Sequence, residues 1–519
     1  MAEKKFSKSQ KSNATFNKPK STKRRGNKKE QRSQSARYSK DLENKVKNAF
    51  QNNGSSEFTE VDQPKNHITW YNRIPSVFES AFSVATVPSL GWPIRYDKHS
   101  TTVGYSVDQL AIPGVMSIEF IPTIGKAQTR LDPVNKVSEA IWKRFRTGIT
   151  SNGWYEPADL MMYFMAADSI YMTLNVLKRL YGVATWYSAR NRYLPDALIE
   201  AMGFRPDDEY LRQSLPLLRM GINKLAAKMA TYHVPGDITL MTRHSWLCAN
   251  IFCDEDPAVT DMTQLYVFVP TYVYKARLSA SGAGSLHPIS FMGDAVVDVL
   301  NEVSDMIDEM AVLFDAIKFS AEVDRVYGNR ICTFSPVELD YQVGPAYDRN
   351  MLLQIHNMVI INDVQPNDIE QYSTSTETTP GASYLKQDMS YDLGSMPWIP
   401  MYSGAVGLDF YSPTVTSDDV CYATRLSAAS TRDSDDGDFY CIYGSELVCN
   451  AYTYRFNGHN VVRDPYYSHM SIDDSVPEST LRMLGAALVF DNAPTIQMLS
   501  KVGTWTEEYP TGGVGYVCE

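Results

Sequence analysis

The sequence has few cysteines, and they form no pattern of a metal site or a disulfide framework. The seven cysteines are an odd number, and no two form a Cys-x-x-Cys pair. The sequence also has no run of about 18 uncharged apolar residues and no apolar secretory signal at its start. The most apolar segment, residues 157–182, is interrupted by Asp159, Asp168 and Lys178, so we expect a core helix. These absences predict reduced, intracellular thiols and no membrane insertion.

The common motifs of catalytic and nucleotide-binding sites are also missing. The chain contains no GxSxG, GxxxxGK[ST], HExxH or GDD motif. The glycine-rich segment 279–288 is not followed by Lys-Ser/Thr, which favours a linker. In the acidic segment 433–438, DSDDGD, glycine is fifth rather than sixth, which favours an exposed turn over a calcium loop. We therefore expect no cofactor, no metal and no enzymatic activity.

Two patterns leave a catalytic or metal-binding alternative open. His244 and Cys248 have the spacing of one helical turn, as a Cys-His dyad would, but a histidine packed in the core also explains the pattern. Residues 294–326 predict one long helix with nine acids. A di-metal carboxylate site needs Glu-x-x-His pairs, which this helix lacks, so we expect a solvated acidic face. Four acids lie near that face: Asp298, Glu302, Asp305 and Glu309.

A strongly basic segment begins an otherwise acidic chain. The net charge is −11, but residues 1–50 hold 16 bases and 4 acids, or +12, so residues 51–519 carry −23. The first 40 residues have only four large apolar side chains, too few for a core, so we expect disorder. Lys and Arg among Ser, Asn and Gln suit phosphate contacts, so RNA binding should be independent of sequence and sensitive to salt. The alternative is a solvated tail or a nuclear localisation signal.

Nine basic residues of this arm are the predicted RNA-binding residues. They are Lys18, Lys20, Lys23, Arg24, Arg25, Lys28, Lys29, Arg32 and Arg37. Two smaller basic clusters, residues 143–146 and 189–192, are predicted to lie on helix faces, with an RNA-facing surface as the second interpretation. The linker after the arm contains Asn53-Gly54, which predicts self-processing or proteolysis between about residues 50 and 66. The alternative is an intact, flexible linker.

The remaining sequence predicts a helical part followed by a β-rich part. Residues 132–148 and 157–182 predict helices, because each segment has proline near its start and glycine at its end. Residues 331–470 hold 18 acids and 6 bases, and Asn457-Gly458 within them is a strong hairpin signal. The expected divisions are a disordered basic arm and linker (1–65), a mainly helical domain (66–330), a β-rich domain (331–470) and a C-terminal segment that returns to the helical domain (471–519).

Five segments, taken in order, resemble the capsid (coat) protein of picobirnaviruses. They are NHITWYNRIP (66–75), IPGVMSIEFIPTIG (112–125), YEPADLMMYFMAADSIYMTLNVLKRLYG (155–182), NRYLPDALIEAMGF (191–204) and DITLMTRHSWLCANIFCDE (237–255). The resemblance is densest between about residues 66 and 255 and thin afterwards. None of these segments is a catalytic motif.

The resemblance implies a viral capsid protein that assembles as dimers into a non-enveloped icosahedral shell around double-stranded RNA segments. The implied fold is α+β, with a mainly α-helical shell domain, a β-rich projecting domain and a disordered basic N-terminal arm facing the interior. The implied partners are other copies of the chain and viral RNA, and the implied locations are the virion and, during assembly, the host cytoplasm. Without the resemblance, the residues leave two other hypotheses: a cellular RNA-binding ribonucleoprotein factor, and a hydrolase that uses His244 and Cys248.

Overall fold

The computed structural model describes residues of one compact unit, which spans residues 87–519. The described residues are 93–94, 110–111, 114–147, 155–187, 193–254, 264–276, 284–289, 291, 295–313, 316–361, 366–373, 383–387, 408–410, 414–433, 437–442, 444–456, 461–466, 469–471, 490, 492–495, 497–500 and 515–517. The predicted arm and linker, residues 1–65, lie outside this part of the chain.

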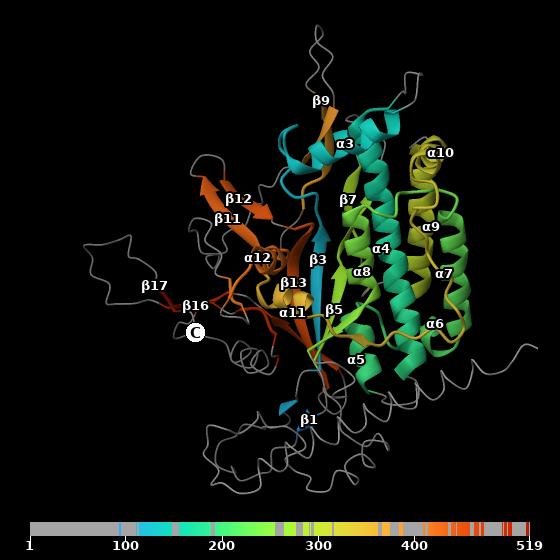
Figure 1. Ribbon diagram of the computed structural model, residues 1–519. Coiled ribbons are helices and arrows are strands. Elements are labelled where there is room, and N and C mark those ends of the chain that lie inside the picture. The colour runs from blue at the N-terminus through green and yellow to red at the C-terminus, as the bar shows by residue number, and fades with distance from the viewer. Residues whose placement is uncertain are drawn as a thin grey trace, which may run out of the picture. The chain divides into compact units, whose positions relative to one another are not determined.

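A six-stranded mixed sheet forms the centre of the unit, in the order β14-β13-β3-β5-β4-β8 (Figure 1). β3 pairs in parallel with β5, and β4 pairs in parallel with β8, whereas the other neighbours are antiparallel. Nearly every residue of β3 and β5 is buried, because protein covers both faces of these strands and their sequences are almost continuously apolar. The six strands are β3 (Val115–Pro122), β4 (Ile251–Cys253), β5 (Leu265–Pro270), β8 (Pro345–Ala346), β13 (Glu446–Phe456) and β14 (Val461–Tyr466).

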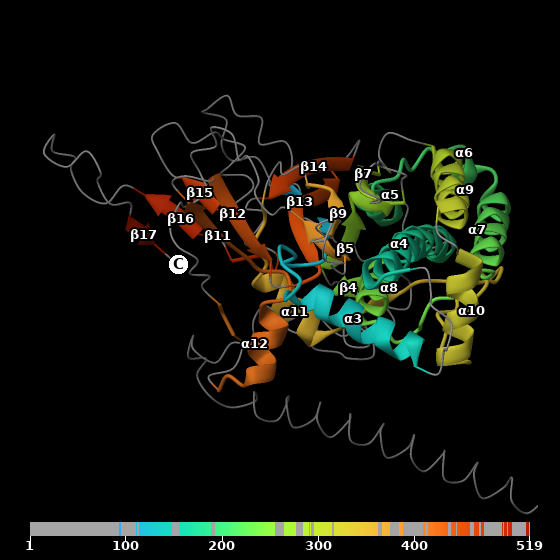
Figure 2. The ribbon, with the colours of Figure 1, turned by 90° about the horizontal axis from the view of Figure 1, so that it is seen from above.

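The 31-residue helix α4 (Pro157–Tyr187) lies at the centre of the helical layer. α3, α5, α7, α8 and α9 all contact it, and Figure 2 shows it enclosed between the sheet and the outer helices. α4 is long and apolar enough to cross a membrane, but 94% of its most apolar window is buried inside the protein. The predicted core helix is therefore confirmed, and it is buried all round rather than along one stripe. The other helices of this layer are α3 (Pro133–Arg146), α5 (Tyr193–Ala201), α6 (Glu209–Arg212), α7 (Leu215–Met229), α8 (Thr239–Ala249), α9 (Val296–Leu313) and α10 (Ala316–Tyr327).

The predicted end of α4 at Gly182 is wrong, because the helix continues to Tyr187. A Cβ atom at position 182 would lie 2.6 Å from Cγ2 of Val343, which is too close for any side chain. Gly182 therefore lets the segment around Val343 pack directly on the helix backbone. Gly182 allows Val343 to lie close to the backbone of α4, and it does not end the helix.

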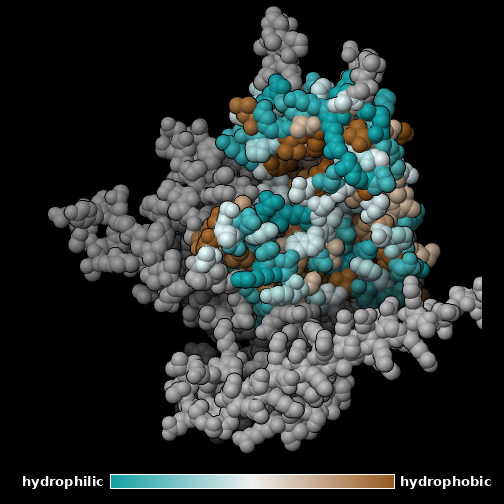
Figure 3. Space-filling view, viewed as in Figure 1, coloured by the Kyte–Doolittle hydropathy of each residue, from teal (hydrophilic) through white to brown (hydrophobic). Residues whose placement is uncertain are grey.

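The other predicted helices are confirmed in outline. α3 spans Pro133–Arg146, within the predicted residues 132–148 and with proline in its first turn. The predicted long helix over residues 294–326 corresponds to two helices, α9 and α10, on the two sides of residues 314–315, which lie outside the described residues. On the face shown in Figure 3, hydrophilic residues alternate with smaller groups of hydrophobic ones.

The β-rich part of the chain contributes hairpins and also a strand of the main sheet. β13 and β14 form an antiparallel pair in which Phe456 pairs with Val461, and the predicted turn residues Asn457 and Gly458 lie outside the described residues. β13 also pairs with β3, so residues 446–456 share the main sheet with residues 115–122. The predicted domain border at residue 331 stays a prediction, and this pairing shows that a strand from beyond it belongs to the central sheet.

The remaining elements are short. β11 and β12 pair in antiparallel fashion up to Asp433 and Gly437, and residues 434–436 of the predicted acidic turn lie outside the described residues. The short strands are β1 (Pro93–Ile94), β2 (Leu110–Ala111), β6 (Tyr272–Lys275), β7 (Ser285–Pro288), β9 (Ile369–Ser373), β10 (Ser383–Gln387), β11 (Ala428–Asp433), β12 (Gly437–Ile442), β15 (His469–Ser471), β16 (Gln497–Ser500) and β17 (Gly515–Val517). Two further helices, α11 (Arg349–His356) and α12 (Ser417–Ala423), lie on the other side of the sheet from α4 (Figure 1).

Candidate functional site

The predicted RNA-binding arm is not among the described residues. This applies to all nine predicted residues, from Lys18 to Arg37, and to the basic cluster at residues 189–192. The cluster at residues 143–146 is described, and it forms the last turn of α3. The structure therefore tests the buried His244 and Cys248, the acidic face of α9 and the basic end of α3.

His244 on α8 is completely buried between two carboxylates. Its Nδ1 lies 2.6 Å from Oδ2 of Asp168 on α4, and its Nε2 lies 3.3 Å from Oε1 of Glu446 on β13. A neutral imidazole can donate from only one nitrogen, whereas both nitrogens face acceptors here. The geometry therefore fits a doubly protonated, positively charged ring.

The charge state of this histidine is fixed by its neighbours. Burial alone lowers the pKa of His244, but the carboxylates of Asp168 and Glu446 outweigh this effect and raise the pKa to about 10. Burial alone raises the pKa of Glu446, but the Arg243 guanidinium and His244 outweigh it and lower the pKa to about 2. Neither group titrates near neutral pH, so His244 is not suited to act as a general base.

Arg243, the neighbour of His244 in α8, completes the group. Its Nε donates to both oxygens of Glu446 at 2.8 Å, and its Nη2 donates to Oε1 of Gln354 on α11 at 2.9 Å. We call Asp168, Arg243, His244 and Glu446 the buried charge cluster. Its two positive and two negative groups balance, and they join α4, α8 and β13 inside the protein. The cluster therefore connects the central sheet to the helical layer.

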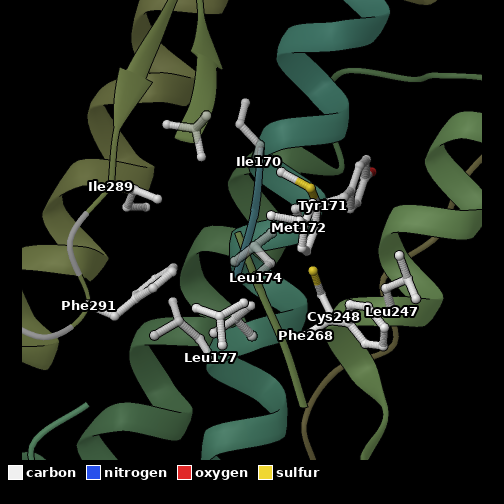
Figure 4. Close-up of a cluster of buried hydrophobic side chains, with 14 of the residues drawn as sticks. Ile170, Tyr171, Met172, Leu174, Leu177, Leu247, Cys248, Phe268, Ile289 and Phe291 are labelled. Carbon is white, nitrogen blue, oxygen red and sulfur yellow. The ribbon is translucent and has the colours of Figure 1, made fainter. Parts of the chain in front are cut away.

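Cys248 does not form a catalytic dyad with His244. Both ring nitrogens of His244 face carboxylates, and burial raises the pKa of the Cys248 thiol to about 12, so the thiol stays protonated at neutral pH. Cys248 instead packs among apolar side chains of α4, α8 and β5 (Figure 4). The structure contradicts the hydrolase hypothesis and confirms the packed core histidine. Cys248, Cys253, Cys332, Cys421 and Cys449 form no disulfide bond.

The acidic face of α9 is used for ion pairs and helix capping. Glu302 pairs with Lys275, and the side chain of Asp298 accepts a hydrogen bond from the backbone N–H of Ala295. Asp305 is exposed to solvent. Among the residues that the structure describes, no three His, Cys, Asp or Glu side chains are grouped so that they could hold a metal ion.

Another buried cation, Arg179 of α4, also has a structural role. Its guanidinium donates to the backbone carbonyls of Leu247, Asn250 and Phe268 at 3.3, 3.0 and 2.8 Å. These carbonyls belong to the end of α8, the residue that follows it and strand β5, so one side chain satisfies acceptors from two elements. Arg179 and the buried charge cluster thus connect helices and strands of the fold.

Comparisons with known proteins agree with one another. A sequence model of the family described as picobirnavirus capsid protein matches residues 70–396, which is more than half of the chain. The capsid protein precursor of human picobirnavirus (strain Human/Thailand/Hy005102/-) is 27% identical over 305 residues, which cover 57% of this chain and 54% of that protein. The chain thus spans about half the length of this curated relative. The X-ray structure of the picobirnavirus capsid has a similar fold, with a TM-score of 0.65, 19% identity and coverage of 87% of this chain and 93% of that chain.

Proposed function

The chain belongs to the picobirnavirus capsid protein family, and from this we propose that it assembles as dimers into a non-enveloped icosahedral shell enclosing double-stranded RNA segments. Membership of a viral capsid family replaces the hypothesis of a cellular ribonucleoprotein factor. The proposed locations are the virion and, during assembly, the host cytoplasm. The role is structural.

The main support for this proposal is that the chain has a basic N-terminal segment and an acidic remainder. Residues 1–50 carry +12 and the remaining residues carry −23, so the two parts suit different partners. The basic arm, with its nine predicted residues from Lys18 to Arg37, binds RNA phosphates inside the shell without reading sequence. The acidic part forms the wall, and its charge keeps the assembled shell soluble.

The β-rich residues 331–470 are proposed to supply the outward-facing, projecting part. They carry 18 acids and 6 bases, a net charge of −12 that would repel genome phosphates if it faced inward. Because β13 lies in the central sheet and β10 packs against α3 and α4, we assign this role to the hairpin β11-β12 and to α12. β13 itself supports the wall.

Deletion of residues 1–50 tests this function. The truncated chain keeps every described element, so it should still form shells, but these shells should contain much less RNA than shells of the full chain. The measurement is the ratio of absorbance at 260 nm to that at 280 nm of purified particles, followed by extraction of their RNA. Equal RNA content in the two kinds of particle would refute the role of the arm.

Processing of the arm remains part of the proposal. Cleavage in the linker between about residues 50 and 66 would release a basic peptide that RNA retains inside the shell. The intact mass of the protein in purified particles should then show a body chain without these first residues. A single stable species at 58.4 kDa would contradict cleavage.

A further inference from the structure

A second basic surface lies on the described body, where the end of α3 meets the end of α10. The last turn of α3 carries Lys143 and Arg144, and Arg330 follows the end of α10 by three residues. Figures 1 and 2 both show the two helix ends side by side, and the two helices are in contact. We propose that these three residues, the α3–α10 basic patch, bind the phosphate backbone of RNA. This inference rests on the proposed capsid function and adds a contact outside the arm.

One aromatic ring brings two of the three cations together. The Arg144 Cζ lies 4.5 Å from the centroid of the Tyr327 ring, and the Arg330 Cζ lies 5.6 Å from it. The two guanidinium groups are therefore within about 10 Å of each other, the sum of these distances. Tyr327 is only 6% exposed, so its ring is covered and is not available for stacking on a base. Such a surface contacts phosphates and does not read sequence.

A third arginine holds the two helix ends in place. Arg325 of α10 donates hydrogen bonds to the backbone carbonyls of Phe145 and Thr147, at the end of α3. These carbonyls have lost their partners within the helix, so Arg325 caps α3 with a group from α10. The patch is thereby fixed before any ligand binds, which lowers the entropic cost of binding.

Most acidic side chains near the patch form ion pairs or hydrogen bonds with residues outside it. Glu139 pairs with Arg130 at 2.6 Å, Glu322 accepts a hydrogen bond from the hydroxyl group of Tyr155, and Asp324 lies 2.5 Å from Nδ1 of His233. Asp237 lies 3.6 Å from Arg330 and shares that cation. Lys143 and Arg144 are exposed and form no ion pair within the described part of the chain.

The chemistry of the patch favours RNA over other anions. Guanidinium groups match the geometry of phosphate oxygens and can bind them in a bidentate manner. The patch is an exposed basic surface on a body with a net charge of −23, and it has the same sign as the arm that is proposed to bind RNA. Arm and patch would then contact the same polyanion.

The test uses the full chain and a matched control. The patch variant is Lys143→Gln/Arg144→Gln/Arg330→Gln, in which the polar side chains still cover Tyr327. The control, Lys126→Gln/Lys224→Gln/Arg349→Gln, removes the same charge from exposed positions elsewhere. Fluorescence anisotropy with a labelled RNA duplex between 50 and 200 mM salt gives the slope of log affinity against log salt. The patch variant should lower this slope by about 2 to 3, and the control by less than about 1.

Further variants and measurements distinguish RNA binding by the patch from a general loss of charge or a role in assembly. The variant Arg144→Lys/Arg330→Lys keeps both charges and should keep the slope, and circular dichroism should show that each variant is folded. Equal losses in the patch and control variants would overturn the inference. A loss of heparin binding without a loss of RNA binding would do the same, as would a block of assembly with unchanged RNA affinity. A chain with all nine arm residues changed to Gln, measured in parallel, tests the proposed function separately.

Discussion

Replacing Asp168 by asparagine is expected to lower the free energy of unfolding by about 3–5 kcal/mol. The substitution keeps the size of the side chain but removes the charge that balances His244, whose Nδ1 lies 2.6 Å away. His244 is fully buried, so water cannot replace the lost carboxylate. The cost is that of an uncompensated charge inside the protein, and urea unfolding monitored by circular dichroism measures it.

An exposed ion pair provides the matched control. Arg205 and Asp207 lie 3.2 Å apart with most of both side chains in solvent, so Asp207→Asn should lower the free energy of unfolding far less than Asp168→Asn. The double variant Asp168→Asn/His244→Gln removes both charges and should be more stable than Asp168→Asn alone. Equal, small effects of Asp168→Asn and Asp207→Asn would show that the buried charge cluster does not stabilise the fold.

The same cluster predicts how stability depends on pH. The raised pKa of His244 means that its stabilising contribution is complete below about pH 6.5 and is lost as the pH rises through about 10. The lowered pKa of Glu446 means that its contribution is complete above about pH 4.5 and is lost as the pH falls through about 2. The cluster therefore stabilises the protein most between about pH 4.5 and 6.5, and Asp168→Asn should flatten the loss at alkaline pH.

RNA affinity of the full chain is expected to fall about a thousandfold between 50 and 200 mM salt, if the arm engages about six phosphates. Each phosphate that a Lys or Arg neutralises releases counterions, and added salt opposes this release. Replacing the nine arm residues, from Lys18 to Arg37, by Gln should remove most of this dependence. Filter binding or anisotropy at several salt concentrations measures it.

A shuffled arm is the control for this experiment. Rearranging residues 17–37 keeps composition and charge, so the salt dependence should stay the same if the binding is independent of sequence. A large loss on shuffling, or a marked preference for one RNA sequence, would contradict a phosphate-only contact. Unchanged binding after replacement of the nine residues would show that the arm does not bind RNA.

Local signals in the sequence were sufficient for several elements. Proline at position 133 marks the start of α3, and the hairpin signal Asn457-Gly458 stands in the sequence between β13 and β14, which pair in antiparallel fashion. These signals act within a few residues, so tertiary packing has little opportunity to override them. The apolar character of residues 157–182 likewise predicts a core helix, because only burial accommodates so many apolar side chains.

Contacts between distant residues could not be predicted in this way. In the sequence, Asp168 interrupts an apolar segment. In the structure it is buried, and a buried acid needs a charged or hydrogen-bonded partner, which the sequence does not identify. The adjacent pair Arg243 and His244 supplies cations for Asp168 and Glu446, but only the fold shows which acids they meet. The role of Gly182 depends on its contact with Val343, which lies far away in the sequence, so the local pattern predicts a helix end that the structure does not have.

Electron microscopy of the chain expressed alone tests the capsid assignment most directly. A chain of this family that builds a shell should form closed, uniformly sized particles without other viral proteins, and three-dimensional reconstruction should show icosahedral symmetry with dimers as the repeating unit. Finding only monomers or dimers, over a range of salt concentrations and pH values at which the protein is folded, would contradict its assembly into a capsid.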